Sequence, residues 1–314
     1  NVMRNFIGNN GLIWFVGVVE DRHDPIELGR VRVRAFGWHT DDKAKIPTEE
    51  LPWAIPMSGI DSASVSGVGK SPTGMVEGTW VFGFFMDGKR AQEPAVIGTI
   101  ATMPSEKADV VKGFNDPNGL YPRYTDESDV NKLARGLKEP KHISDEIKND
   151  FSEIKEPAEP FAAKYPYNHV TETESGHIKE YDDTAGKERI REWHKTGTFY
   201  EIHPDGTKVE HIVKDNYQII AGNNAIHVKG NVDVFIDANT NITVSGNLTA
   251  LVKKNADITI NENLTALVNK DAKITVDGNT TLKVGKNFDA SIGGTCTMKS
   301  GGNMKFTAPK IDIN

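Results

Sequence analysis

The segment Ser66 to Ser71 (SGVGKS) has the residue types of a loop that binds phosphate through backbone N–H groups. That motif needs a further glycine five positions before Gly69, and this chain has Ser64 there. No strand leads directly into a helix at this point. The sequence therefore predicts an ordinary surface loop, with no nucleotide and no other cofactor bound to it.

The other residues that could do chemistry do not gather either. The nine histidines are dispersed, and the two that come nearest to ligand spacing, His203 and His211, flank a hairpin turn. Cys296 has no evident base near it in the sequence. It occupies an even-numbered position, as the apolar residues around it mostly do, which indicates a small buried hydrophobe. No pair of carboxylates suggests acid/base work. We predict no catalytic, cofactor-binding or metal-binding residue, and a protein that is not an enzyme.

Composition narrows the class of protein further. The 314 residues are 37% hydrophobic, enough for two or more folded domains. The net charge of -7 argues against a nucleic-acid partner, which needs a basic face. The longest apolar run, Leu12 to Val19, is too short to span a membrane. With no secretory signal and one cysteine, we expect the chain to fold in a reducing cytosol.

The first hundred residues alternate runs of β-branched and aromatic residues with turn-forming pairs such as Asp24-Pro25 and Asp87-Gly88. Their length and spacing predict a small barrel. The predicted strands are Leu12 to Val19, Arg30 to Phe36, Val76 to Met86 and Ala95 to Ile100. The core would be filled by Trp14, Phe15, Trp53, Trp80, Phe82 and Phe84.

Residues 105–163 are rich in proline and charge and are predicted to be a linker, in which Lys132 to Leu137 and Ser144 to Ile154 could form short helices. The alternation of apolar and polar residues that is typical of strands returns after Lys164. The turn sequence Pro204-Asp205-Gly206 separates two apolar runs, Phe199 to Ile202 and Lys208 to Val213, and predicts a β-hairpin.

The most informative feature is an eight-residue repeat. A β-branched residue recurs at every eighth position, and three residues later there is usually Asn or Asp, as at Asn231 and Asn239, which tolerates a turn. Even-numbered positions around them are mostly apolar and odd-numbered ones mostly polar, so each strand has one dry face. The recurring residues, predicted to form the interior, are Val228, Ile236, Val244, Val252, Ile260, Val268, Val276, Val284 and Ile292.

Eight residues hold one strand and a corner but cannot close a circuit. A single-chain solenoid with three sides of about six residues needs roughly 18 residues per coil. Three chains that each supply one side per octad would close a triangular prism, so the period predicts an interleaved homotrimer. The alternative is an antiparallel meander within one chain. Gly301-Gly302, followed by Phe306, ends the repeat and favours a trimeric tip that another protein could cap over the alternative, a frayed terminus.

Several segments resemble one family, the central spike of T-even-like phage baseplates, which is related to the spike part of type VI secretion proteins. Trp14 to Arg22 (WFVGVVEDR), Asp24-Pro25 and Leu28 to Arg34 (LGRVRVR) resemble the opening of its OB-fold domain. Three further segments resemble the part of the family's sequence that leads into its triple-stranded β-helix. They are Thr173 to Ile178 (TESGHI), Tyr181 to Thr184 (YDDT) and Gly197 to Glu201 (GTFYE).

The resemblance implies an all-β chain in four parts: an OB-fold barrel (1–104), a linker (105–163), a β-rich neck (164–224) and a triple-stranded β-helix with its tip (225–314). The best-known member has a lysozyme domain between barrel and spike, where this chain has only the linker. No catalytic glutamate can therefore be carried over. The absence of a hub region before the barrel favours the phage version over the secretion version.

The expected function is that of a structural, cell-puncturing spike in the baseplate of a contractile phage tail, located in the virion and assembled in the host cytoplasm. The implied partners are two further copies of the chain, a trimeric hub protein at the OB-fold end, a PAAR-like capping protein at the tip, and the bacterial outer membrane as target. The alternatives are the spike of a type VI-like secretion or tailocin device, a tail lysozyme homologue that degrades cell wall, and a glycan-binding or receptor-binding fibre.

Overall fold

The computed structural model describes residues 12–137, 146–148 and 153–311. Regular structure in these ranges consists of β-strands and two short 3-10 turns, η1 (Thr48–Glu50) and η2 (Gly88–Arg90), so the prediction of an all-β chain is confirmed. None of the described residues form a helix that could cross a membrane. Residues 1–235 and 236–314 are two separate units and are described one at a time.

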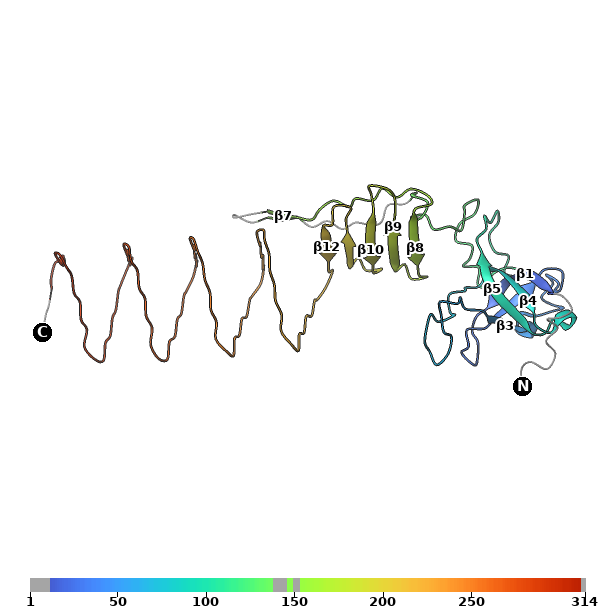
Figure 1. The fold of residues 1–314 in the computed structure, drawn as a ribbon, viewed down its shortest axis with the longest axis horizontal. Helices are drawn as coiled ribbons and strands as arrows, with labels where there is room; N and C mark the ends of the chain where they lie inside the picture. The colour runs from blue at the N-terminus through green and yellow to red at the C-terminus, as the bar shows by residue number, and fades with distance from the viewer. Residues whose placement is uncertain (1–11, 138–145, 149–152, 312–314) are drawn as a thin grey trace. The chain divides into compact units, whose positions relative to one another are not determined.

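Five strands near the N-terminus close into a barrel (Figure 1). They are β1 (Trp14–Asp21), β2 (Val31–Ala35), β3 (Trp53–Pro56), β4 (Trp80–Phe85) and β5 (Pro94–Ile100). The order around the barrel is β1-β2-β3-β5-β4, and only β3 and β5 pair in parallel. This is the five-stranded topology of an OB fold. Four of the strands were predicted, whereas β3 was missed because its four residues are too few to show a period.

The barrel core is filled by small and medium side chains from alternate strand positions. Two rings, Phe15 and Phe85, lie inside with centroids 4.8 Å apart. Gly83 allows the ring of Phe15 to approach β4, because a Cβ at that position would lie 2.6 Å from Cζ of Phe15. The remaining buried residues of the cluster are Val19, Val31, Val33, Ala35, Ala54, Val81, Ala91 and Val96.

The predicted aromatic core is wrong for most of its members. Trp14 and Trp80 lie on the outer barrel surface and are 58% and 38% exposed. Phe82 is half-buried beside Trp14, and the guanidinium of Arg32 covers the ring of Trp53 at 4.3 Å. The narrow barrel has no room for these rings, since valines already fill its inward positions.

A buried ion pair fixes the outer side of the barrel. Arg34 on β2 and Glu20 on β1 are both fully buried, and Nε of Arg34 donates to Oε1 of Glu20 at 2.6 Å. Glu20 also accepts hydrogen bonds from Thr48 Oγ1 and from the backbone N–H of Phe114. The pair therefore joins two strands to η1 and to a segment about ninety residues later in the chain.

That later segment, residues 101–137, runs without regular strands and is called the strap here. It packs on its surroundings: Asp116 and Leu133 are buried, and Gly113 N–H donates to the carbonyl of Asp41. Lys132 to Leu137 forms turns and not the predicted helix. The second predicted helix is also wrong where it is described, because β6 (Glu146–Lys148) and β7 (Glu153–Lys155) pair as strands; the rest of Ser144 to Ile154 lies outside the described residues.

An antiparallel meander follows, in the order β12-β11-β10-β9-β8 (Figure 1). Its strands are β8 (Asn168–Glu172), β9 (Ile178–Asp182), β10 (Arg189–Trp193), β11 (Phe199–Ile202) and β12 (Lys208–His211). The predicted hairpin is confirmed between β11 and β12, where Gly206 has the positive φ of 85° that the turn requires.

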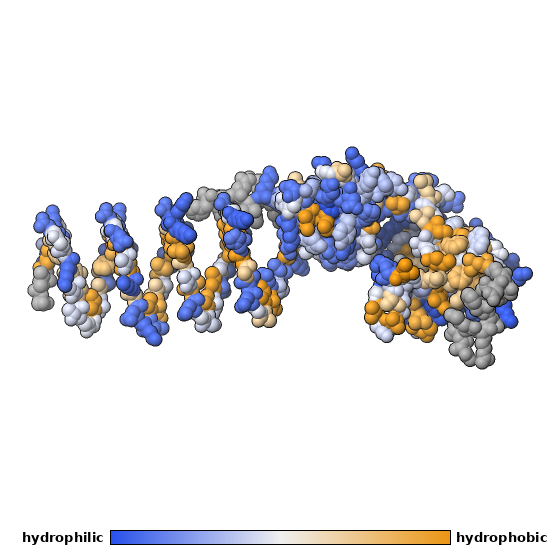
Figure 2. Space-filling view, viewed as in Figure 1, coloured by the Kyte–Doolittle hydropathy of each residue, from blue (hydrophilic) through white to orange (hydrophobic). Residues whose placement is uncertain are grey.

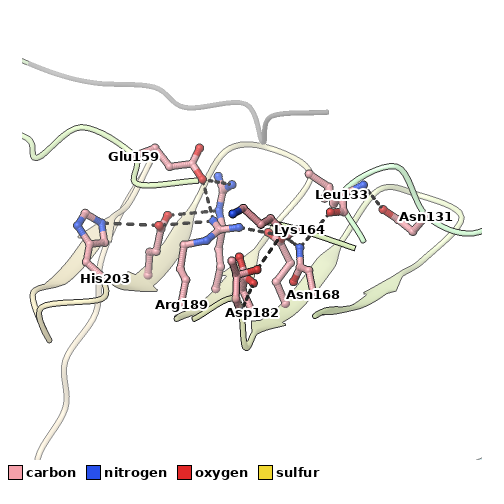
Figure 3. A network of polar contacts seen from close by, with 12 residues as sticks. Asn131, Leu133, Glu159, Lys164, Asn168, Asp182, Arg189 and His203 are labelled. Atoms are coloured by element: carbon pink, nitrogen blue, oxygen red, sulfur yellow. Dashed lines mark hydrogen bonds and ion pairs between the residues drawn. The ribbon is translucent and has the colours of Figure 1, made fainter. Parts of the chain in front are cut away.

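One face of this sheet holds a buried ionic network, part of which is labelled in Figure 3. Arg189 lies 2.7 Å from Glu159 and 3.0 Å from Glu180, and Arg191 lies 3.3 Å from Glu159 and 3.7 Å from Glu201. All five side chains are at most 8% exposed. Glu159 comes from the chain that precedes β8, so the network holds this segment against the sheet.

The network has three carboxylates for two guanidinium groups, which leaves a surplus of negative charge. Burial raises the pKa of Glu159 to about 7, and the neighbouring Glu201 and Glu180 add to the rise although Arg191 and Arg189 oppose it. Burial also lowers the pKa of Arg191. The carboxyl of Glu159 therefore changes charge near neutral pH.

Residues 215–300 contrast with the barrel and the meander. Six-residue extended segments alternate with two-residue bends at a constant interval of eight residues, as at 245–246, 253–254 and 261–262. In Figure 1 residues 236–311 trace a regular zigzag. No strand pairing and no backbone hydrogen bond joins residues of 215–300, all of which are described. The single chain thus does not form the meander that was the alternative for this repeat.

The Arg34 and Glu20 pair predicts a strong, asymmetric mutational effect. Arg34→Met leaves the Glu20 carboxylate buried without its counter-ion, so the free energy of unfolding of the barrel should fall by about 3–5 kcal/mol. In Arg34→Met/Glu20→Leu both charges are gone, and most of that loss should be recovered. Urea unfolding of the three proteins checks this. Equal losses in the single and double variants would contradict it.

The Glu159 pKa predicts a pH-dependent stability difference. Its folded pKa lies above the unfolded value, so folding binds a proton between the two values, and ionisation of Glu159 opposes folding as the pH rises. Glu159→Gln is neutral at every pH. The unfolding free energy of this variant minus that of the wild type should therefore increase from about pH 5 to about pH 8.

Urea unfolding at a series of pH values, followed through the fluorescence of buried Trp193, measures the difference. Glu192→Gln is the matched control, since Glu192 lies on the exposed face of β10, the strand that holds Arg189 and Arg191. A Glu159→Gln difference that stays constant with pH, or that only follows the pH dependence of the control, would contradict the prediction.

Candidate functional site

The largest unexplained surface of the chain is apolar. The nine predicted interior residues are 43–58% exposed, whereas the core valines of the barrel are at most 2% exposed. They are called the octad face here, and Figure 2 shows the apolar side chains of the repeat beside hydrophilic ones. The residues are Val228, Ile236, Val244, Val252, Ile260, Val268, Val276, Val284 and Ile292.

Each of the nine residues occupies the same structural position. Ile260 is the last residue of the extended segment 255–260, directly before the bend at 261–262, and the other eight precede their bends in the same way. The period predicted from the sequence is therefore the period of the backbone. That the side chains of different copies meet at an axis stays a prediction.

The predicted role of the asparagines needs a correction. Asn247, Asn255 and Asn263 open the extended segments, and the bends fall on the two residues before them. No asparagine of the series has a positive φ. The turn sequence was therefore placed one or two residues too late, because glycine and lysine at the bends were given less weight than asparagine.

Apolar exposure extends beyond these nine residues. Ile258 and Ile274, two positions before an octad-face residue, are 84% and 90% exposed. Leu251 and Leu267, which break the parity rule, are also highly exposed. A run of exposed aliphatic residues on unpaired extended chain is unusual for a protein alone in water, and it indicates an interaction surface.

The segments singled out for nucleotide or metal chemistry do not form such sites among the described residues. Val65 to Lys70 lies in an exposed loop that contains an isolated Val65–Val68 bridge. Asp21, His23 and Glu77 have ligand atoms within 4.8 Å of one another. However, Nε of Arg22 lies 3.3 Å from Glu77, which supplies a positive charge where a cation would bind.

The next residues are those whose pKa is shifted or whose side chain could react or bind a metal. Glu159, the carboxyl with a pKa of about 7, is enclosed by Arg189 and Arg191. Cys296 was predicted to be buried but is exposed in a single chain, as its neighbours in the repeat are. Of the two histidines that come nearest to ligand spacing, His203 approaches Glu201 at 3.7 Å and His211 approaches Glu156 at 3.2 Å.

One cluster of polar contacts was not predicted. Glu174, in the turn between β8 and β9, accepts hydrogen bonds from Arg22 on the barrel side and from Tyr121 of the strap. Arg123 donates to the backbone carbonyl of Glu174. A contact across about 150 residues has no local sequence pattern from which it could have been recognised.

Comparison with known proteins gives a consistent result. Residues 37–177 match the family described as the Gp5 N-terminal OB domain. Protein Gp5 of Vibrio phage KVP40 is 40% identical over 274 residues, which cover 74% of this chain and 65% of that protein. The pre-baseplate central spike protein Gp5 of Enterobacteria phage T4 is 49% identical over 133 residues, 41% of this chain and 23% of that protein.

The match thus covers under two thirds of the length of either of these relatives. The family match at residues 37–177 contains β3, β4 and β5 of the barrel and β8 of the meander, whereas β1 and β2 precede it. The observed barrel has the strand order of the matched domain's fold class. Residues 37–177 therefore match the Gp5 OB domain, and the chain is similar to Protein Gp5 of Vibrio phage KVP40 and to the pre-baseplate central spike protein Gp5 of Enterobacteria phage T4.

Proposed function

We propose that the chain is a structural, cell-puncturing spike at the centre of a contractile phage tail baseplate, and that it acts as a homotrimer without catalytic activity of its own. The observation that carries this proposal is the exposed octad face on backbone that makes no hydrogen bonds within one chain. The names of the relatives support the place in the baseplate.

Three copies would explain both the exposed octad face and the backbone groups that have no partner within one chain. If each chain supplies one side of a triangular prism per octad, the segments of neighbouring chains pair as strands, and the octad face turns inward. The backbone N–H and C=O groups then find partners, and the apolar side chains leave water. The product is a narrow rod with a dry interior, whose useful property is stiffness.

We propose two further partners, and exposed apolar residues support each of them. A trimeric hub protein would bind the barrel, whose outer surface carries the partly exposed rings of Trp14, Phe36 and Trp80. A PAAR-like protein would cap the end of the repeat, where Phe306 and Ile311 are exposed. The target is the bacterial outer membrane, and the location is the virion tail baseplate after assembly in the host cytoplasm.

The spike of a secretion or tailocin device would use the same geometry, and the baseplate relatives favour the phage version. A cell-wall hydrolase is the competing function of a different class. Its best candidate acid by pKa, Glu159, is buried and is paired with Arg189 and Arg191 in the ionic network.

The proposed trimer predicts a face-specific effect of one charge. Ile260→Asp would place three carboxylates close together in the dry interior, and trimer yield should collapse because three unpaired charges cannot be desolvated there. Thr259→Asp is the matched control, since the adjacent side chain points outward. Light scattering of the purified proteins should give a trimer for wild type and Thr259→Asp only. A monomeric wild type, or a trimeric Ile260→Asp variant, would contradict the proposal.

The proposed lack of catalysis predicts that the purified wild-type trimer releases no soluble fragments from peptidoglycan above the buffer blank. A commercial lysozyme in the same assay provides the positive control. Release of fragments by the wild type would contradict the proposed lack of catalysis and favour the cell-wall hydrolase function.

A further inference from the structure

The extended segments of residues 239–300 contain a second pattern inside the eight-residue repeat. Each segment has three even-numbered positions, of which the last is the octad-face residue, apart from Ser300 in the final segment. The first and second hold one small and one large side chain in every segment. The pairs are Thr240/Ile242, Leu248/Ala250, Ala256/Ile258, Leu264/Ala266, Ala272/Ile274, Thr280/Leu282, Phe288/Ala290 and Cys296/Met298.

The order of small and large inverts from one segment to the next. Ala256/Ile258 is followed by Leu264/Ala266 and then by Ala272/Ile274, which makes a true repeat of sixteen residues. The inversion fails at one place only within 239–300, where Ala272/Ile274 is followed by Thr280/Leu282 in the same order. The pattern therefore has a regular part and a single break in phase.

Nothing within one chain uses this alternation. Leu248, Ile258, Leu264 and Ile274 are 74–90% exposed, so their sizes are not matched to any neighbour of the same chain. The bends and the extended segments are the same for both kinds of segment. Because local backbone does not require it, the alternation must serve contacts with other chains if it serves packing at all.

In the proposed trimer, the alternation has a defined geometric meaning. Each chain steps to the next face after eight residues, so the strand beside segment 255–260 on one face is segment 263–268 of another chain. Equivalent positions then stack in columns along the rod, one column for each of the three inward positions. Large and small residues alternate along both of the first two columns, so each ring of three alanines lies next to a ring of three leucines or isoleucines.

We propose that this alternation sets the register in which two further copies of the chain pack against the first. The proposal rests on the proposed trimer and names the contact that aligns it. A chain displaced by one octad brings Leu beside Leu and Ala beside Ala in the columns, which creates overlap at one level and a void at the next.

A displacement by two octads would restore the match in residues 239–276, because sixteen residues is the period there. The break at Thr280/Leu282 prevents this. In register it gives one contact of like order, between Ala272/Ile274 and Thr280/Leu282. A displacement by two octads places segments 255–260, 263–268 and 271–276 beside 279–284, 287–292 and 295–300, and all three contacts are then of like order. The regular part thus excludes slips of eight residues, and the break excludes slips of sixteen. A strictly periodic shaft would have no such discrimination.

Disulfide crosslinking of the full chain in a Cys296→Ser background reads the register. Asp257, Thr265 and Lys273 occupy the same outward position in consecutive segments. In register, residue 257 of one copy lies beside residue 265 of the next, at about the 4.8 Å strand spacing that a disulfide can bridge. Asp257→Cys/Thr265→Cys should give a covalent trimer, whereas Asp257→Cys/Lys273→Cys should give no crosslink.

The swap Ala256→Leu/Ile258→Ala tests whether the alternation causes that register. It keeps the composition of the segment but places three Leu/Ala segments in succession. Its Tm should fall by roughly 5 °C or more, and the crosslink between positions 257 and 273 should appear in it. The control swap Asp257→Thr/Thr259→Asp, in the chain without added cysteines, exchanges two outward residues and should leave the Tm unchanged.

The outcomes separate the two proposals. A swap variant that keeps wild-type Tm and crosslinks only 257 to 265 overturns the register proposal and leaves the trimer standing. A crosslink between 257 and 273 in the unswapped chain also overturns the register proposal. A crosslink that forms within one chain, in a protein that is monomeric by light scattering, overturns the trimer itself.

Discussion

An eight-residue unit of extended chain cannot satisfy its own backbone. A strand leaves its N–H and C=O groups to be paired laterally, and the bend after six residues turns the chain away before any part of it can return alongside. Residues 215–300 show this directly, since none of their backbone groups pair within the chain. The same segments expose an apolar residue before every bend, so hydrogen bonding and burial are unsatisfied together.

The barrel satisfies these requirements internally, and the meander does so except at its two edge strands, β8 and β12. The barrel closes on itself and leaves no edge, and the meander pairs all five strands in sequence. Close contacts in the barrel require glycine, as at Gly83, where a Cβ would collide with the ring of Phe15. At Gly246 and Gly278, in the bends of the repeat, a Cβ would meet no atom within 4 Å. In the proposed trimer, the neighbours of these residues would belong to other chains.

The sequence allowed those parts of the fold to be predicted in which a few adjacent residues decide the outcome. The hairpin at Gly206 depends on the conformational freedom of one residue, and the period of the repeat depends on spacing alone. The prediction failed where distant partners decide. Trp14 has the composition of a core residue but lies outside, and β3 is too short to carry a pattern.

The candidate site follows the same division. The nine octad-face residues were predicted because they repeat, whereas the ionic network was missed because Glu159, Arg189 and Glu201 are brought together only by the meander. The hydrogen bonds of Glu174 were missed for the same reason. Charged residues in strands are normally assigned to the solvent face, and nothing in the local sequence marks those that a later or earlier segment will cover.

A repeat that is so regular carries a difficulty of its own. Identical segments pair equally well in several alignments, so regularity favours a straight, stiff rod but weakens the specification of register. The paired inward positions offer a resolution that costs no regularity of the backbone. Leu248/Ala250 and Ala256/Ile258 fill similar volumes, so every layer of a trimer would have nearly the same width, while the order of the two residues still differs between neighbouring layers. Constant width and changing order are independent properties of the sequence, and a shaft made of three copies needs the first for its shape and the second for its alignment.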